Sequence, residues 1–193
     1  MITGFITAVV RDRDGKVIGR ERHKLRSYVR AYNHLLNAQA RTIEGPPDPA
    51  ITTKDTGNTE RNIHYADIAF RCNAPIGTTT YGIRVGTDNT AVDIEQYALI
   101  AEIAQGSGAG QMEHQAVVFT DIGVAANVCS FEVERVILNN SLGVINVAEG
   151  AIYCQGKDTL GTTRYFMIAR DLITLAVPDG GAITVTYTLR VVA

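Results

Sequence analysis

The side chains best suited to catalysis or metal binding lie far apart in this sequence. It holds four histidines with no pair three or four residues apart: His23, His34, His64 and His114. It holds three cysteines with no Cys-x-x-Cys pair: Cys72, Cys129 and Cys154. Neither a disulfide framework nor a zinc site is therefore encoded in an obvious way. We expect all three cysteines to be buried or half-buried hydrophobic side chains.

Three short motifs match pieces of known sites but lack the rest of each site. Asp55-Thr56-Gly57 is the tripeptide of aspartic proteases, yet it occurs once and without flanking hydrophobic strands. Residues 12–15 (DRDG) begin like a calcium loop without its later acidic ligands, and residues 106–110 (GSGAG) lack the lysine of a phosphate-binding loop. We expect turns and a linker at these places, and no enzyme, cofactor or metal site. A catalytic group assembled only by the fold is the lesser alternative.

Composition narrows the class of protein. A chain of 193 residues, 46% hydrophobic and 20% charged, is expected to form one domain. A net charge of −2 argues against nucleic acid as the main ligand. No apolar run approaches the roughly 18 residues of a membrane-spanning helix, and the N-terminus lacks the pattern of a secretory signal. We therefore expect a protein made and kept in the cytoplasm, without a membrane partner.

The first forty residues predict a hairpin followed by a helix. Two β-prone runs flank Asp14-Gly15, a pair typical of a tight hairpin turn in which both residues have positive φ. Ser27 is a plausible N-cap for the segment that follows. Apolar residues recur in it at helical spacing: Tyr28, Val29, Tyr32, Leu35 and Leu36. We expect one helix here, within a segment 1–40.

Residues 41–62 hold three of the five prolines, with glycines and polar residues between them. This composition predicts a long surface loop, and loops of such length are usually functional or ordered by a partner. We expect it to be a contact arm. Its predicted assembly contacts are Pro46, Pro47, Pro49, Asp55 and Arg61.

The remaining segment, residues 63–193, predicts strand after strand. The last strand alternates strictly, with Ile183, Val185, Tyr187, Leu189 and Val191 on one face and Thr184, Thr186, Thr188 and Arg190 on the other. Short strands separated by turn signals, without alternating helices, indicate an antiparallel β-sandwich. The predicted fold class is mainly β, a jelly-roll-like antiparallel sandwich with an N-terminal hairpin and one α-helix. Strand order is not encoded in periodicity, so a jelly roll and other antiparallel sandwiches stay open.

Residues 80–193 resemble virion structural proteins of tailed phages and related viruses. The resemblance rests on five short pieces in a fixed order: Val85-Gly86-Thr87, 93–99, 147–153, Ala169-Arg170-Asp171 and 177–191. It implies a repeated or decorating subunit of a capsid, neck or tail, found in the virion after synthesis in the host cytoplasm. Its partners would be copies of itself, as a homo-oligomer, and other virion proteins.

The turn and strand motif of this resemblance consists of Arg170, Asp171, Pro178, Asp179 and Gly180. We interpret Arg170 and Asp171 as an ion pair or capping group beside the last turn. The alternative function is a receptor- or carbohydrate-binding module of a fibre or adhesin. That alternative predicts an exposed aromatic cluster on one loop face. The tyrosines favour it little, because Tyr28, Tyr32, Tyr97, Tyr153, Tyr165 and Tyr187 mostly fall where elements should pack.

Overall fold

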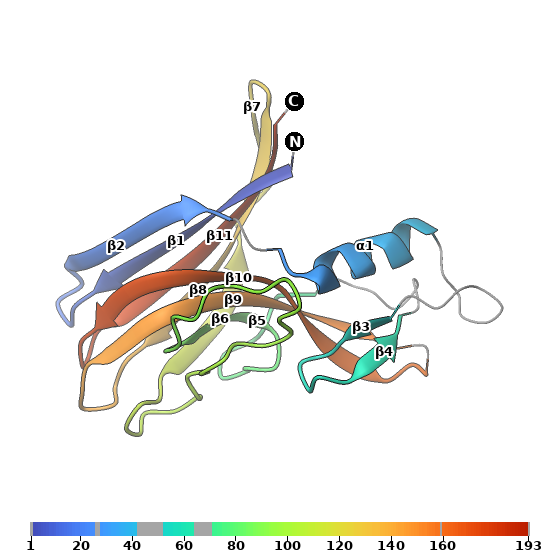
Figure 1. Ribbon diagram of the computed structural model, residues 1–193. Helices are drawn as coiled ribbons and strands as arrows, with labels where there is room; N and C mark the ends of the chain where they lie inside the picture. Colours follow the sequence, from blue (N-terminus) through green and yellow to red (C-terminus); the bar gives the residue numbers. More distant parts are fainter. Residues whose placement is uncertain (1, 26–27, 42–51, 64–70, 159, 193) are drawn as a thin grey trace.

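The computed structural model describes residues 2–25, 28–41, 52–63, 71–158 and 160–192 (Figure 1). The helix is α1 (Arg30–Arg41). The strands are β1 (Ile2–Arg11), β2 (Val17–Lys24), β3 (Thr52–Lys54), β4 (Glu60–Asn62), β5 (Gly82–Gly86), β6 (Glu113–Phe119), β7 (Gly123–Ala125), β8 (Val128–Leu138), β9 (Ile145–Lys157), β10 (Thr163–Val177) and β11 (Ala182–Val192). The prediction of a mainly β protein with one helix and an N-terminal hairpin is confirmed for these residues.

Two antiparallel sheets pack on each other. The larger sheet has the order β2-β1-β11-β8-β6, with β7 pairing to β8, and the smaller has the order β10-β9-β5. The chain passes from the larger to the smaller sheet between β2 and β5, returns after β5, crosses again after β8 and returns after β10 (Figure 1). Beyond these sheets, β3 and β4 form a separate hairpin that lies with α1 at one end of the molecule.

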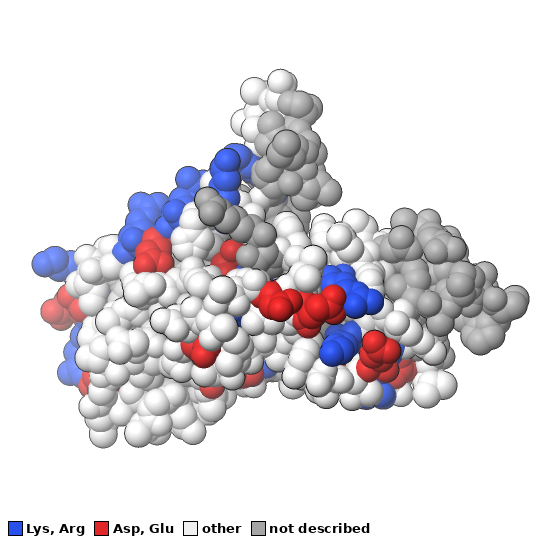
Figure 2. All heavy atoms as spheres, in the orientation of Figure 1, with Lys and Arg blue, Asp and Glu red and all other residues white. Residues whose placement is uncertain are grey.

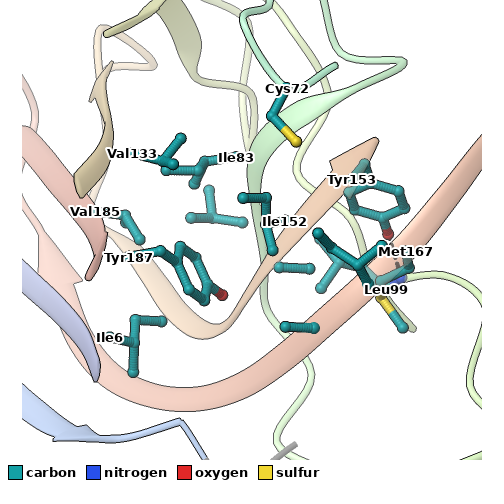
Figure 3. Packing of buried hydrophobic residues seen from close by; sticks show 14 of the residues in the cluster. Ile6, Cys72, Ile83, Leu99, Val133, Ile152, Tyr153, Met167, Val185 and Tyr187 are labelled. Atoms are coloured by element: carbon teal, nitrogen blue, oxygen red, sulfur yellow. Dashed lines mark hydrogen bonds between the residues drawn. The ribbon is translucent and has the colours of Figure 1, made fainter. Parts of the chain in front are cut away.

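The core lies between the two sheets and is built by alternation. Ile183, Val185 and Tyr187 of β11 are fully buried, whereas the threonines between them are half-exposed, as predicted. Figure 3 shows Val185 and Tyr187 from the larger sheet facing Ile152 of the smaller sheet. Each such side chain contributes roughly 1.5–3 kcal/mol by leaving water. The last strand is therefore a central part of the fold, between β1 and β8.

The β1–β2 hairpin is confirmed, but its turn differs from the predicted one. The loop spans residues 12–16, and within it only Gly15 has positive φ, at 79°. An oxygen of the Asp12 carboxylate accepts hydrogen bonds from the backbone N–H groups of Asp14 (3.0 Å) and Lys16 (2.9 Å). Because this side chain stabilises the longer loop, Asp14 does not need the strained conformation of a two-residue turn.

The helix is confirmed, although it begins at Arg30, and Ser27 lies outside the described residues. Val29 and Leu35 are buried on the side that faces β10, while Arg30 is exposed. The N–H of Val29 donates to the carbonyl of Ile168 in β10 (3.3 Å), which joins the start of the helix to the smaller sheet.

The prediction of one long loop over residues 41–62 is wrong for its second half. Residues 52–62 form the β3–β4 hairpin, and residues 42–51, with Pro46, Pro47 and Pro49, lie outside the described residues. The prolines that argued against a strand all precede residue 50, so nothing in 52–62 prevents pairing. Asp55 closes this hairpin in the way that Asp12 closes the first one.

Candidate assembly surface

An apolar arm projects from the larger sheet. We define it as residues 118–129, the end of β6, β7 and the start of β8, and its one charged residue is Asp121. Ile122 and Val124 are 71% and 75% exposed, and Val118 and Phe119 are about half exposed. The β7–β8 hairpin stands beyond the body of the molecule beside the ends of β1 and β11 (Figure 1). In Figure 2 the described atoms of this projection are white, so no charged side chain covers the face in view.

A groove of about 460 Å³ lies at the base of the apolar arm. Its walls come from the arm (Phe119, Ile122), from α1 (Tyr32, Leu36) and from β10 (Ile168). The volume is within the range of small-molecule pockets, roughly 300–1,000 Å³, but the polar groups that would orient a ligand are few. Together the arm and the groove form a continuous apolar surface, of a kind that usually marks contact with another protein.

Two tyrosines line the groove on its helical side. The rings of Tyr28 and Tyr32 lie 4.5 Å apart between centroids. Burial, then the neighbouring Tyr32 and the negative charge of Asp171, raise the pKa of Tyr28 to about 12. Tyr28 therefore stays a neutral phenol at neutral pH. The groove consequently presents no negative charge from this tyrosine.

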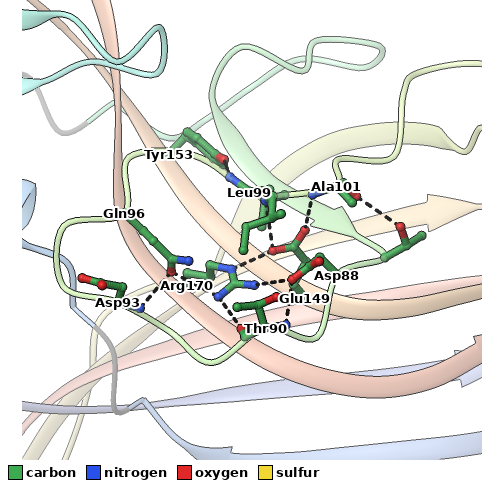
Figure 4. A network of polar contacts seen from close by, with 11 residues as sticks. Asp88, Thr90, Asp93, Gln96, Leu99, Ala101, Glu149, Tyr153 and Arg170 are labelled. Atoms are coloured by element: carbon green, nitrogen blue, oxygen red, sulfur yellow. Dashed lines mark hydrogen bonds and ion pairs between the residues drawn. The ribbon is translucent and has the colours of Figure 1, made fainter.

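A buried polar network holds the long connection between β5 and β6 against the smaller sheet (Figure 4). Its centre is an ion pair between Arg170 of β10 and Glu149 of β9, both fully buried, with 2.7 Å between Nε and Oε2. Arg170 also donates to the carbonyl of Thr90 (3.0 Å) and to the side chain of Gln96 (3.1 Å). Both partners belong to residues 87–112, a connection in which the structure assigns no helix and no full strand.

Glu149 accepts hydrogen bonds from the same connection. Its carboxylate receives the backbone N–H groups of Ala101 (2.9 Å) and Ile100 (3.3 Å). The hydroxyl of Tyr153 receives the N–H of Leu99 (2.6 Å). A Cβ atom at Gly86 would lie 2.3 Å from a Glu149 oxygen, so glycine is required there. The quoted pieces 85–87, 93–99, 147–153 and 169–171 therefore meet in one network that stabilises the fold.

The predicted pairing of Arg170 with Asp171 is wrong. Successive side chains of a strand point to opposite faces, so these neighbours in β10 cannot face each other. Arg170 pairs with Glu149, and with Asp88 at 3.6 Å. Asp171 is buried on the other face, where burial and its negative charge raise the pKa of Tyr187 well above its usual value. Both residues lie within β10 and not beside its last turn.

The turn predicted at Pro178, Asp179 and Gly180 is present between β10 and β11. Gly180 has a φ of 72°, and its N–H donates to the carbonyl of Asn139 (2.7 Å). Asp179 accepts from the N–H of Leu142 (3.0 Å) and from Arg13 (3.3 Å). The β10–β11 turn is therefore bonded both to the β8–β9 connection and to the β1–β2 turn.

Asp55 and Arg61 form an ion pair within the β3–β4 hairpin, with 2.7 Å between Nε and Oδ2. Burial alone would raise the pKa of Asp55, but hydrogen bonds from Arg61, Thr59 and Gly57 outweigh it and hold the pKa below its usual value. Both carboxylate oxygens are therefore occupied inside the hairpin. Whether these residues also contact another copy stays a prediction.

The same hairpin turn occurs a second time. Residues 158–164 (DTLGTTR) repeat the Asp-Thr-x-x-Thr-x-Arg pattern of residues 55–61 (DTGNTER). Asp158 accepts from the N–H groups of Leu160 and Thr162, and pairs with Arg164 at 2.8 Å. The two hairpins lie side by side, because Ile63 forms a bridge with Asp158 and the N–H of Thr56 donates to the carbonyl of Tyr165. Our sequence analysis missed this repeat, although its signal is plain in the printed sequence.

The cysteines are only partly as predicted. Cys72 and Cys154 are buried in the core, and burial raises the pKa of Cys72 to about 12. Cys129 is exposed at the rim of the groove, so the prediction is wrong for it.

Residues 12–16 and 106–110 form turns and a loop, as expected. Among the described residues, no group of three His, Cys, Asp or Glu side chains could hold a metal ion. Within the same residues, α1 is neither long nor apolar enough to cross a membrane.

Comparison with known proteins adds no family. No protein-family model, no curated protein and no solved structure matches the chain. The function must therefore be argued from the surface and the network described above.

Proposed function

We propose that this protein is a structural subunit of a virus particle, in its capsid, neck or tail, and that it assembles with copies of itself and other virion proteins. The observation that carries the proposal is the apolar arm. Ile122 and Val124 leave most of their surface in water, in a segment where one residue in twelve is charged. Such a surface is costly to keep exposed, and contact with a neighbouring subunit would bury it.

The two edges of the larger sheet support the same reading. At one edge, β2 carries exposed Arg20, Arg22 and Lys24, the charges that usually protect an edge strand from pairing. The other edge consists of β6, whose one charged residue is Glu113, and of β7, an apolar tripeptide of residues 123–125. A sheet with a charged edge strand at one side and an apolar edge at the other fits a protein that binds its partner at the apolar edge.

The buried network suits a subunit that must keep its shape without disulfide bonds. Arg170 and Glu149 hold a long irregular connection to the sandwich through contacts that all lie inside the protein. The resemblance to virion structural proteins falls on these residues and supports the same proposal.

The alternative function, a receptor- or carbohydrate-binding module, predicts an exposed aromatic cluster. Among the described residues the tyrosines expected to pack do so: Tyr153 and Tyr187 are buried, and Tyr28, Tyr32, Tyr97 and Tyr165 are half-buried. The groove brings Tyr28, Tyr32 and Phe119 together, but few polar groups accompany them to orient a ligand, so it favours the alternative little.

The test compares two isoleucines of similar exposure. Ile122→Asp places a charge on the apolar arm, whereas Ile76→Asp makes the same change at a site 66% exposed, beside the start of β6 and away from the arm. We expect wild-type and Ile76→Asp protein to form oligomers by light scattering, and Ile122→Asp to stay smaller at the same concentration. Equal masses for all three proteins would show that the arm is not an assembly surface.

A further inference from the structure

The outer face of the larger sheet carries two rows of side chains with an ordered charge pattern. The strand registers place Arg22, Thr7, Thr186 and Glu134 side by side across β2, β1, β11 and β8. The next row reads Lys24, Phe5, Thr188 and Glu132. Across these four strands, each row thus begins with a cation on β2, has uncharged side chains on β1 and β11, and reaches an anion on β8. Beyond β8, Val118 of β6 continues the first row.

The cations stand out over this face. Arg22 and Lys24 are exposed, and Figure 2 shows Lys and Arg side chains gathered over β2. The guanidinium of Arg22 lies 4.1 Å from the centre of the Phe5 ring, so it leans over the sheet. The guanidinium of Arg190 lies 4.5 Å from the centre of the same ring, so it is a further cation on the outer face.

The anions are held in place at the other side of the same face. Glu134 accepts a hydrogen bond from Thr186, and Glu132 accepts one from Thr188, both at 3.0 Å. Within the described part of the chain, neither carboxylate makes an ion pair, and neither Arg22 nor Lys24 makes one. Both ends of each row keep their charge available for a partner.

A second copy of the chain matches this pattern through one symmetry operation. A twofold axis that runs along the strands, between β1 and β11, places β2 of one copy over β8 of the other. Arg22 then faces Glu134 of the second copy and Lys24 faces Glu132, and the two reciprocal pairs follow by symmetry. An axis across the strands would place cation on cation. Sheets stacked face to face lie about 10 Å apart with strands within about 30°, and long side chains at both margins can meet across that gap.

We infer that the outer face of the larger sheet is a twofold interface between two copies of this protein, joined by the pairs Arg22–Glu134 and Lys24–Glu132. This inference rests on the proposed function, because it names one contact by which the copies assemble. The threonines, Phe5 and the guanidinium of Arg190 over the Phe5 ring lie at the centre of the interface, and the opposite charges at the two margins fix its direction.

A charge-exchange experiment tests the interface. Arg22→Glu alone places two carboxylates opposite each other at both symmetric contacts, and Glu134→Arg alone places two guanidiniums there. We expect each variant alone to dimerise at least about tenfold more weakly than the wild type. In an equimolar mixture, the new carboxylate of one variant faces the new guanidinium of the other, so dimers form again. Lys16→Glu, an exposed change of the same charge in the β1–β2 turn, is the control and should dimerise like the wild type.

The readout is mass by sedimentation velocity over a concentration series, with circular dichroism to verify folding. Lys24→Glu with Glu132→Lys gives a second exchange pair if one of the first variants folds poorly. Single variants that keep the wild-type mass, or a mixture that does not regain it with either pair, would overturn the interface while leaving the proposed function standing. A wild type that remains monomeric at every concentration would overturn the proposed function as well. Binding of wild-type monomers to an oligonucleotide through Arg22, without pairing of copies, would also overturn this inference.

Discussion

Replacement of Arg170 by methionine should destabilise this protein more than any surface substitution. Methionine fills part of the same volume but cannot donate to Glu149, Thr90 or Gln96. The carboxylate of Glu149 then stays fully buried without its guanidinium partner. A buried charge that loses its partner is one of the few changes with a large effect on stability.

The magnitude follows from the contacts. Breaking a buried ion pair from one side costs about 3–5 kcal/mol, and each lost hydrogen bond to the connection costs about 1 kcal/mol. Part of this overlaps, so we expect the free energy of unfolding to fall by about 4 kcal/mol. That is a large share of the 5–15 kcal/mol typical of a folded domain.

Urea unfolding, followed by circular dichroism at neutral pH, measures this change. Arg13→Met is the matched control, because Arg13 forms an exposed ion pair with Asp179 and should cost less than about 1 kcal/mol. Adding Glu149→Gln to Arg170→Met removes the unpaired charge, so the double variant should be more stable than Arg170→Met alone by about 2 kcal/mol. The reasoning fails if Arg170→Met costs no more than Arg13→Met, or if the second substitution restores nothing.

Two further predictions concern the buried basic side chains of His114 and Arg135. Burial, with the positive charges of Arg135 and Arg84, lowers the pKa of His114 from 6.5 to about 3. The unfolded chain thus binds a proton below pH 6.5 that the folded chain does not, so the free energy of unfolding should fall by about 1.4 kcal/mol per pH unit below that point. Urea titrations at pH 7, 6 and 5 should show this dependence on pH in the wild type, and His114→Gln should show little of it. An unchanged dependence in His114→Gln would contradict the assignment of this effect to His114. Arg135 is fully buried and donates to backbone carbonyls, and no carboxylate of the described residues pairs with it. Arg135→Met should therefore lower the free energy of unfolding by about 3 kcal/mol. Arg135→Lys should restore little of this loss, because lysine lacks the guanidinium fork. Full recovery with lysine in the same unfolding assay would argue against that role.

The sequence is sufficient to predict the β-class of this fold because its strands alternate. Ile183, Val185 and Tyr187 could be assigned to one buried face from spacing alone, and the structure buries all of them. The hairpin at Gly15 was equally accessible, although not the details of its turn. Which strands are neighbours could not be deduced, because the pairing of β11 with both β1 and β8 joins residues far apart in the chain.

The buried ion pair was missed for a physical reason. Asp171 is the carboxylate nearest to Arg170 in the sequence, so a local ion pair was expected. Successive side chains of a strand point to opposite faces, however, so these two cannot pair. Glu149 lies 21 residues away in the chain, as the one charged residue of the run 147–154 (VAEGAIYC) within β9. A charged residue in such a strand must find a partner, and that signal could have found the pair.

The candidate surface could not be located from sequence. Val118, Ile122 and Val124 look like ordinary strand residues, and only the extension of the β7–β8 hairpin beyond the sandwich leaves them in water. The proline-rich segment drew attention because of its composition. The structure places only its second half, and there Asp55 and Arg61 bind each other.

The most direct test of the account is the mass of the purified protein by light scattering over a concentration series, with negative-stain imaging of the same samples. The account predicts a defined oligomer, a ring or a tube that becomes more populated as concentration rises. A single monomeric species up to high micromolar concentration, with no larger particle in the images, would contradict the claim that this protein assembles with copies of itself.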